Sequence, residues 1–158
     1  MNPTPDPVPA RLRVIPSRLL AGAAVVADRL VGERLAAEGA RKWHFAVLVA
    51  LAEAGSASQA ELSRRTSIYR SDMVAVLNEL ADAACVRREP DPADRRRNVI
   101  TLTPAGRRHL ERLDTLITEA QHELLAPLTP AEQDELTRLL TVLTEHHLPP
   151  HLRPHDAQ

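Results

Sequence analysis

The sequence predicts a mainly α-helical protein that carries one small β-hairpin. Apolar residues recur at intervals of three and four, the helical period, in most segments of the 158-residue chain. Two short β-branched runs, 86–89 and 99–102, instead flank the turn Pro90-Asp91-Pro92, and they predict two antiparallel strands. A chain of this length has room for a single domain with extensions.

Six helices are predicted, each with an end signal. Pro16 suits the first position of the first helix, and Gly39 and Gly55 follow the ends of the first two. The predicted helices span residues 16–38, 43–54, 59–65, 70–83, 104–126 and 130–146.

The remaining helix starts carry caps of known chemistry. Ser58 and Glu61 form a capping box, in which each side chain accepts from a free backbone N–H of the first turn. Thr103 and Thr129 each precede a proline, which predicts a capped start for the last two helices. Helix 70–83 has one apolar stripe, formed by Met73, Val76, Leu77 and Leu80.

Both ends of the chain, residues 1–15 and 147–158, are proline-rich and are predicted to be disordered or flexible tails. The N-terminal tail lacks the apolar core of a signal peptide, and no apolar run approaches the roughly 18 residues of a membrane span. We therefore expect a cytoplasmic protein without a membrane partner. The single cysteine, Cys85, fits a reducing compartment.

The outer helices predict a homodimer. Segments 16–38 and 104–146 carry apolar stripes too extensive for isolated arms, and they flank the central segment 42–103. The economical interpretation is a helical dimerisation region that buries these stripes against a second copy of the chain.

The net charge of −1 hides a segregation of charge along the chain. Residues 56–110 carry 10 basic and 7 acidic side chains, whereas residues 111–158 carry 3 and 9. A basic central segment is compatible with a nucleic-acid partner, because binding depends on where the cations lie.

Segment 42–103 has the element order of a winged helix-turn-helix, in which the helix before the hairpin enters the DNA major groove. The face of that helix opposite its buried stripe is nearly uncharged, whereas a solvated helix face normally carries charges. Small apolar and amide groups suit contact with base edges. The predicted major-groove residues are Tyr69, Arg70, Ser71, Val74, Ala75 and Asn78.

The chain resembles the MarR family of transcriptional regulators over roughly residues 17–146. The most specific part is DPADRR, followed by a strand and then LTPAG. The resemblance implies a homodimer that binds double-stranded DNA at a pseudo-palindromic operator. It also implies a wing in which Asp94 orients the loop, Arg95 or Arg96 enters the minor groove, and Arg97 contacts a phosphate or solvent.

The sequence departs from the family pattern at two positions. Tyr69 stands where the family often has a Ser, Asp or Asn cap, so a cap is missing unless Ser67 or Ser71 replaces it. Ala84 stands where the turn after this helix usually has glycine, and a left-handed alanine costs about 1 kcal/mol. The turn is therefore expected to differ or to carry strain.

Most members of the family are repressors relieved by a small anionic or phenolic ligand, so we expect a repressor with an effector of unknown identity and no required cofactor. The candidate ligand residues are Trp43 and His44, because the family's ligand cleft lies near the start of the second helix, and Arg18, because its charge suits an acidic ligand. Packing in the core is the competing interpretation for Trp43 and His44.

Three alternatives remain on the sequence alone. Cys85 could sense oxidants, although a small buried residue in an apolar run is the commoner role. A zinc sensor would need about four ligands held together, and the histidines are scattered: His109, His122, His146, His147, His151 and His155. A helical partner protein that does not bind DNA would not need the hairpin arginines. No catalytic motif is present, so we expect no enzyme.

Overall fold

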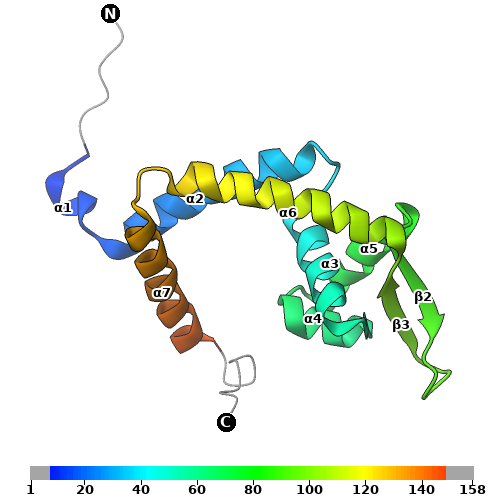
Figure 1. Ribbon diagram of the computed structural model, residues 1–158. Helices are drawn as coiled ribbons and strands as arrows, with labels where there is room; N and C mark the ends of the chain where they lie inside the picture. The colour runs from blue at the N-terminus through cyan, green and yellow to red at the C-terminus, as the bar shows by residue number, and fades with distance from the viewer. Residues whose placement is uncertain (1–7, 149–158) are drawn as a thin grey trace, which may run out of the picture.

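The computed structural model of the protein describes residues 8–148, which form seven helices and a three-stranded antiparallel sheet (Figure 1). No described helix has the length and apolar character needed to cross a membrane. The elements are α1 (Ala10–Arg13), α2 (Pro16–Ala36), α3 (Lys42–Ala54), β1 (Ser56–Ala57), α4 (Gln59–Thr66), α5 (Arg70–Asp82), β2 (Val86–Pro90), β3 (Asn98–Leu102), α6 (Pro104–Leu125) and α7 (Pro130–His147).

The predicted fold class is confirmed, and the six predicted helices and two strands lie within one or two residues of their expected bounds. Two elements differ from the prediction. Residues Ala10–Arg13 form α1 within the segment predicted to be a disordered tail, so that prediction is wrong there; residues 1–7 and 149–158 lie outside the described residues. Strand β1, which was not predicted, adds a third strand by pairing Ser56 with Thr101.

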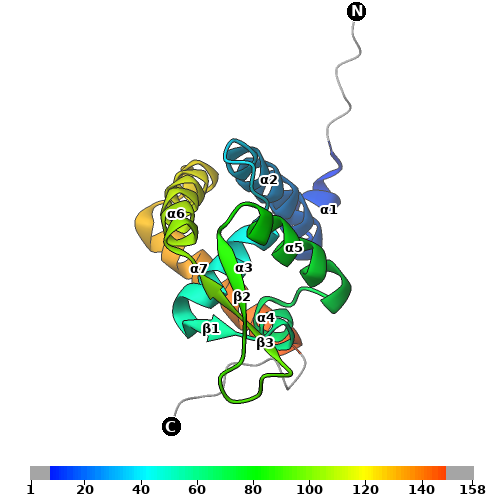
Figure 2. The same ribbon diagram turned by 90° about the vertical axis from the view of Figure 1, so that its right-hand side faces the viewer.

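The core lies where α3, α4, α5 and the first half of α6 meet the sheet (Figure 2). Leu102 and Val86 pair across β3 and β2, and Ile100 pairs with Arg88 in the same register. The largest fully buried side chains are Leu35, Leu48, Leu51, Leu62, Met73, Leu77 and Leu113. Because Leu113 belongs to α6, the core extends past the predicted domain boundary at residue 103.

Helices α2 and α6 lie side by side and run in opposite directions (Figure 1). The Arg34 guanidinium joins them by donating to Glu119 at 2.9 Å and to Glu123 at 2.7 Å. Part of the apolar stripe of α6, which was expected to meet a second copy, is instead buried within one chain. Its buried residues are Leu110 and Leu113, which belong to the core, and Ala120.

Apolar side chains remain exposed on two other helices. Helix α7 follows the end of α6 that is remote from the sheet (Figure 1). None of the residues Pro130–His147 of this helix is buried. Residues of α7 and of the N-terminal part of α2 are between 37% and 70% exposed: Leu19, Leu20, Val25, Val26, Leu139, Leu140, Val142 and Leu143. Within one chain, these apolar residues of α7 and of the N-terminal part of α2 therefore remain accessible to solvent.

The turn between α5 and β2 keeps a left-handed residue despite the absence of glycine. Ala84 has φ 55°, and Cys85 N donates to Leu80 O at 2.8 Å across the helix end. Thr103, the N-cap of α6, donates through its hydroxyl to Ala84 O at 2.6 Å. The turn thus carries a left-handed residue without glycine, and Ala84 adopts this conformation at a cost of about 1 kcal/mol.

Candidate nucleic-acid interface and the adjoining cleft

Helix α5 is held by the short helix α4 that precedes it. The predicted capping box of α4 is confirmed: Ser58 N donates to Glu61 Oε2 at 2.7 Å, and Glu61 N donates to Ser58 Oγ at 3.3 Å. The backbone hydrogen bond from Ser58 is the main cause of the lowered pKa of Glu61. A stable α4 fixes the position from which α5 projects.

The structure places the six predicted major-groove residues on or beside one exposed face of α5. Tyr69 is 81% exposed and Val74 is 44% exposed, while Met73 and Val76 point into the core without exposure. The exposed members of this surface are Tyr69, Arg70, Ser71, Val74, Ala75 and Asn78, here called the α5 outer face.

The start of α5 has no side-chain cap, as the sequence indicated. Tyr69 occupies the N-cap position and makes no side-chain cap bond. Ser67 does not replace it, because that residue ends α4 in a left-handed conformation at φ 57°. The first-turn N–H groups of α5 therefore lack a side-chain acceptor, and such groups at a helix N-terminus can bind an anion.

The loop between β2 and β3 is closed by its own backbone and by Asp94. Asp91 N donates to Arg97 O at 2.8 Å. Asp94 Oδ1 accepts from the backbone N and from Nε of Arg96, both at 3.1 Å, and these bonds lower the pKa of Asp94. Asp94 thus remains ionised and holds the loop and the Arg96 side chain in one arrangement.

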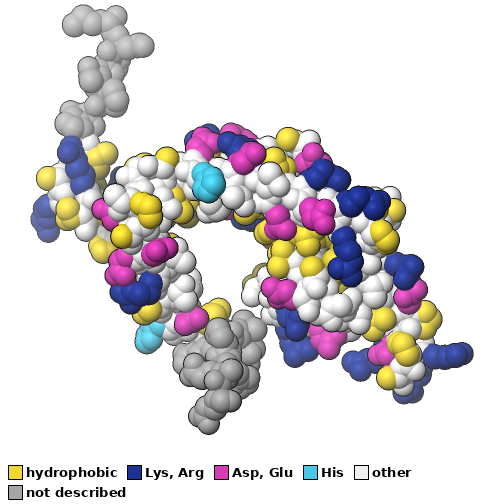
Figure 3. Space-filling view, in the orientation of Figure 1, with side chains coloured by type: hydrophobic (Ala, Val, Ile, Leu, Met, Phe, Trp, Pro, Cys, Tyr) yellow, Lys and Arg dark blue, Asp and Glu magenta, His cyan; other side chains and the backbone are white. Residues whose placement is uncertain are grey.

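The five arginines of the hairpin have different surroundings, although Figure 3 shows cationic side chains gathered around its tip. Arg96 is 91% exposed despite its bond to Asp94. The side chains of Arg95 and Arg97 make no hydrogen bond or ion pair within residues 8–148, although the charge of Arg97 contributes to lowering the pKa of Asp94 and of Glu61. Arg87 pairs with Glu89 at 2.9 Å, whereas Arg88 donates to Asn78 of α5 at 2.8 Å.

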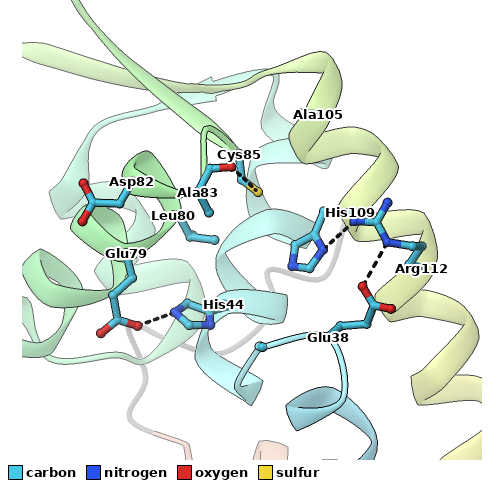
Figure 4. Close-up of a pocket in the computed structure, with 11 residues that line it drawn as sticks. Glu38, His44, Glu79, Leu80, Asp82, Ala83, Cys85, Ala105, His109 and Arg112 are labelled. Atoms are coloured by element: carbon cyan, nitrogen blue, oxygen red, sulfur yellow. Dashed lines mark hydrogen bonds and ion pairs between the residues drawn. The ribbon is translucent and has the colours of Figure 1, made fainter.

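A cleft of about 600 Å³ lies behind α5, between the end of α2, the start of α3, and α6 (Figure 4). Its walls carry charged and titratable groups together with small apolar ones. The residues that line it are Glu38, Gly39, His44, Glu79, Leu80, Asp82, Ala83, Cys85, Ala105, His109 and Arg112.

One wall of the cleft connects α3 with α5 through His44. The ring is buried; its Nδ1 accepts from Arg41 N at 3.1 Å, and its Nε2 lies 2.7 Å from Glu79 Oε2. Glu79 also pairs with the Arg41 guanidinium. Hydrogen bonds from Arg41 and then from His44 lower the pKa of Glu79. Glu79 belongs to α5 and lines the cleft.

The opposite wall carries an ion pair between Arg112 of α6 and Glu38, which follows α2. Arg112 donates through Nε to Glu38 at 3.1 Å and through Nη2 to His109 Nδ1 at 3.1 Å. Burial, followed by the neighbouring Arg112 charge, lowers the pKa of His109, so this ring is neutral at neutral pH. Arg112 is therefore the cationic group of this wall, and its guanidinium is hydrogen-bonded to Glu38, to His109 and to the carbonyl oxygen of Arg108.

Of the three predicted ligand residues, only His44 lines this cleft. Trp43, 38% exposed, is not among the lining residues. Arg18 lines a separate groove between α1 and the start of α2. Eighteen residues of helix separate Arg18 from Ala36, the end of α2 that is nearest the cleft, which is a distance of roughly 27 Å along the helix axis. The structure thus does not bring these three residues together within one chain.

Sequence reasoning missed Glu79, Arg112 and Arg88. Glu79 and His44 are 35 positions apart, and Arg112 and Glu38 are 74 apart, so no local spacing marks them. The alternation along β2 could have found Arg88, because it places this residue on the same side as buried Val86, towards α5.

The sensing alternatives find no support. Burial raises the pKa of the Cys85 thiol, and a protonated buried thiol reacts slowly with oxidants. No three His, Cys, Asp or Glu side chains of residues 8–148 are grouped to hold a metal. His151 and His155 lie outside the described residues.

Comparison with known proteins gives one consistent family. The family model described as "MarR family" matches residues 40–97. The chain is 34% identical over 79 residues to the uncharacterized HTH-type transcriptional regulator YcgE of Bacillus subtilis, an alignment that covers 50% of this chain and 51% of the relative. The chain spans about half the length of the curated relatives it matches.

Solved structures match over nearly their full length. A probable transcriptional regulator from Pseudomonas aeruginosa is 32% identical with a TM-score of 0.76, and the match covers 84% of this chain and 99% of that one. A MarR mutant from E. coli complexed with operator DNA is 27% identical, with a TM-score of 0.73 and coverage of 86% and 99%. A Mycobacterium tuberculosis MarR family protein in complex with p-aminosalicylic acid is 30% identical, with a TM-score of 0.67 and coverage of 82% and 98%.

Proposed function

Since the chain belongs to the MarR family, we propose that the protein is a sequence-specific DNA-binding transcriptional repressor that binds a pseudo-palindromic operator as a homodimer. The observation that carries the proposal is the α5 outer face, which is exposed and nearly uncharged and lies beside a hairpin with exposed arginines. Val74 and Ala75 suit thymine methyl groups, while the arginines suit phosphates and a narrow minor groove.

A second copy of the chain would cover the exposed apolar residues of α2 and α7. The charges of these surfaces are complementary, since α1 and the start of α2 carry Arg11, Arg13 and Arg18, whereas α7 carries Glu132, Asp134 and Glu135. Two copies would also present two α5 helices, which is what a pseudo-palindrome requires.

Selection from a randomised DNA duplex library tests the proposal. We expect the wild type to enrich a pseudo-palindrome and light scattering to give a mass of two chains on each duplex. Arg95→Ala should weaken binding to all duplexes about equally and should make the slope of log affinity against log salt shallower by about one. A library that stays random after selection would contradict the proposal.

We further propose that the cleft behind α5 binds a small aromatic anion that relieves repression. The Arg112 guanidinium and the His44 ring converge there, and p-aminosalicylic acid is bound by the M. tuberculosis relative. An anion on Arg112 would repel the Glu79 carboxylate across the cleft. Because Glu79 belongs to α5, such a ligand would favour a different position of the recognition helix.

Titration with p-aminosalicylate as the probe tests this cleft. The ratio of operator affinities without and with millimolar probe should be about 10 for the wild type and close to 1 for Arg112→Ala. Arg108→Ala removes the same charge one turn earlier on α6, from a side chain that does not line the cleft, and should keep the wild-type ratio. An equal ratio for wild type and Arg112→Ala would place any ligand elsewhere.

A further inference from the structure

The contact between the hairpin and the recognition helix determines how one DNA-reading side chain is presented. We infer that Arg88 orients the carboxamide of Asn78 so that its amide nitrogen faces the DNA, which sets a preference for guanine over adenine at the base pair that Asn78 meets. This inference rests on the proposed function, because it concerns how the same surface discriminates between operators.

The geometry of the contact is unambiguous. Arg88 Nη2 lies 2.8 Å from Asn78 Oδ1 and joins β2 to α5 across ten positions of sequence. A guanidinium has only N–H donors, so the atom that it meets has to be the carboxamide oxygen rather than the nitrogen. The Asn78 amide nitrogen therefore points away from Arg88, and both of its N–H groups remain available on the exposed α5 outer face.

Arg88 is held in reach of Asn78 by the strand. It pairs with Ile100 of β3, and alternation along β2 places it on the same side as buried Val86 and therefore towards α5. Arg87, the preceding residue, lies on the other side and pairs with Glu89. Arg88 is thus a positioning residue, whereas Arg87 carries the same charge without touching the α5 outer face.

The consequence for DNA reading follows from the groups on the base edges. An asparagine that reads adenine uses both ends of its amide, since the oxygen accepts from N6 and the nitrogen donates to N7. The oxygen keeps a second lone pair, but its bond to Arg88 turns it towards β2, so the end of the amide that is presented to the DNA carries donors. Guanine presents two neighbouring acceptors, N7 and O6, whereas adenine presents one acceptor and one donor. A side chain that presents its donor end to the DNA therefore favours guanine.

Single-substitution duplexes built on the selected operator test the inference. Asn78→Ala first identifies the base pair, as the position where discrimination is lost. At that position the wild type should prefer guanine over adenine by about 10-fold, and Arg88→Met should reduce the preference to about 2-fold or shift it to adenine. Asn78→Asp keeps an oxygen for Arg88 but replaces the donor by an acceptor. This variant should therefore prefer cytosine, instead of guanine, at the same position.

Arg87→Met is the matched control, since it removes the same charge from the adjacent residue. It should weaken all duplexes alike and keep the guanine preference. If Arg88→Met weakens the affinity for all duplexes equally, and by as much as Arg87→Met does, Arg88 only contacts phosphate and the inference is wrong. An Asn78→Ala protein with unchanged discrimination at every position would also overturn the inference. Failure of the wild type to select any sequence would overturn the proposed function as well, so the two failures are distinguishable.

Discussion

Replacing Val74 by glutamate is expected to abolish specific operator binding while the chain remains folded. Val74 is 44% exposed at the centre of the α5 outer face, so the substitution adds a charge without disturbing the core. A carboxylate at that place faces base edges lined with acceptors and lies between two phosphate backbones. We expect the affinity for the selected duplex to fall by 100-fold or more, which is about 3 kcal/mol, measured by fluorescence anisotropy.

Val74→Thr is the control for this substitution, because threonine has nearly the same shape and no charge. It should keep binding within about 10-fold of the wild type. Thermal unfolding of both variants should match the wild type, since an exposed position away from the core changes stability little. Wild-type operator affinity in Val74→Glu would show that α5 does not enter the groove.

Replacing Gly106 by alanine is expected to lower the free energy of unfolding by about 3 kcal/mol. A Cβ at this position would lie 2.0 Å from Cys85 O, and that carbonyl accepts from Thr103 N in the turn after α5. Neither backbone can yield without breaking the contact that joins α6 to the hairpin. Overpacking of this kind costs about 1–3 kcal/mol and more where backbone is involved, which chemical denaturation followed by circular dichroism can measure.

Gly32→Ala provides a comparison with the opposite sign. Gly32 lies inside α2, and a Cβ there meets no atom within 4 Å. Alanine in a helix interior is favoured over glycine by about 1 kcal/mol, so this variant should be more stable than the wild type. Equal effects of the two substitutions would show that α6 does not approach the turn as closely as the structure indicates.

The elements that the sequence predicted well are those fixed by local chemistry. The capping box of Ser58 and Glu61, the caps at Thr103 and Thr129, and the stripe of α5 all depend on residues within one or two turns. Strand β1 escaped prediction because two residues, Ser56 and Ala57, cannot show alternation. Helix α1 escaped because a single turn between prolines carries no periodicity.

The candidate DNA surface was predictable in its residues but not in its contacts. Helical spacing alone places Val74 and Asn78 on one face, and the structure agrees. The bond between Arg88 and Asn78 and the bond between His44 and Glu79 join separate elements, so they depend on how β2 and α3 pack on α5. Arg18 is a different case, because it lines a groove at the end of α2 that is remote from the cleft behind α5.

Helix α6 gives the molecule a mechanical property. Its first half is packed into the core that carries α5, and its second half runs along α2 towards the exposed apolar surfaces. Twenty-two residues of helix are about 33 Å long, so a tilt of about 5° at one end moves the other by about 3 Å. In a homodimer, the distance between the two α5 helices therefore depends on how the far end of α6 is packed. We expect substitutions at that end of α6 to change the operator spacing that the dimer accepts, although the substituted residues do not contact DNA.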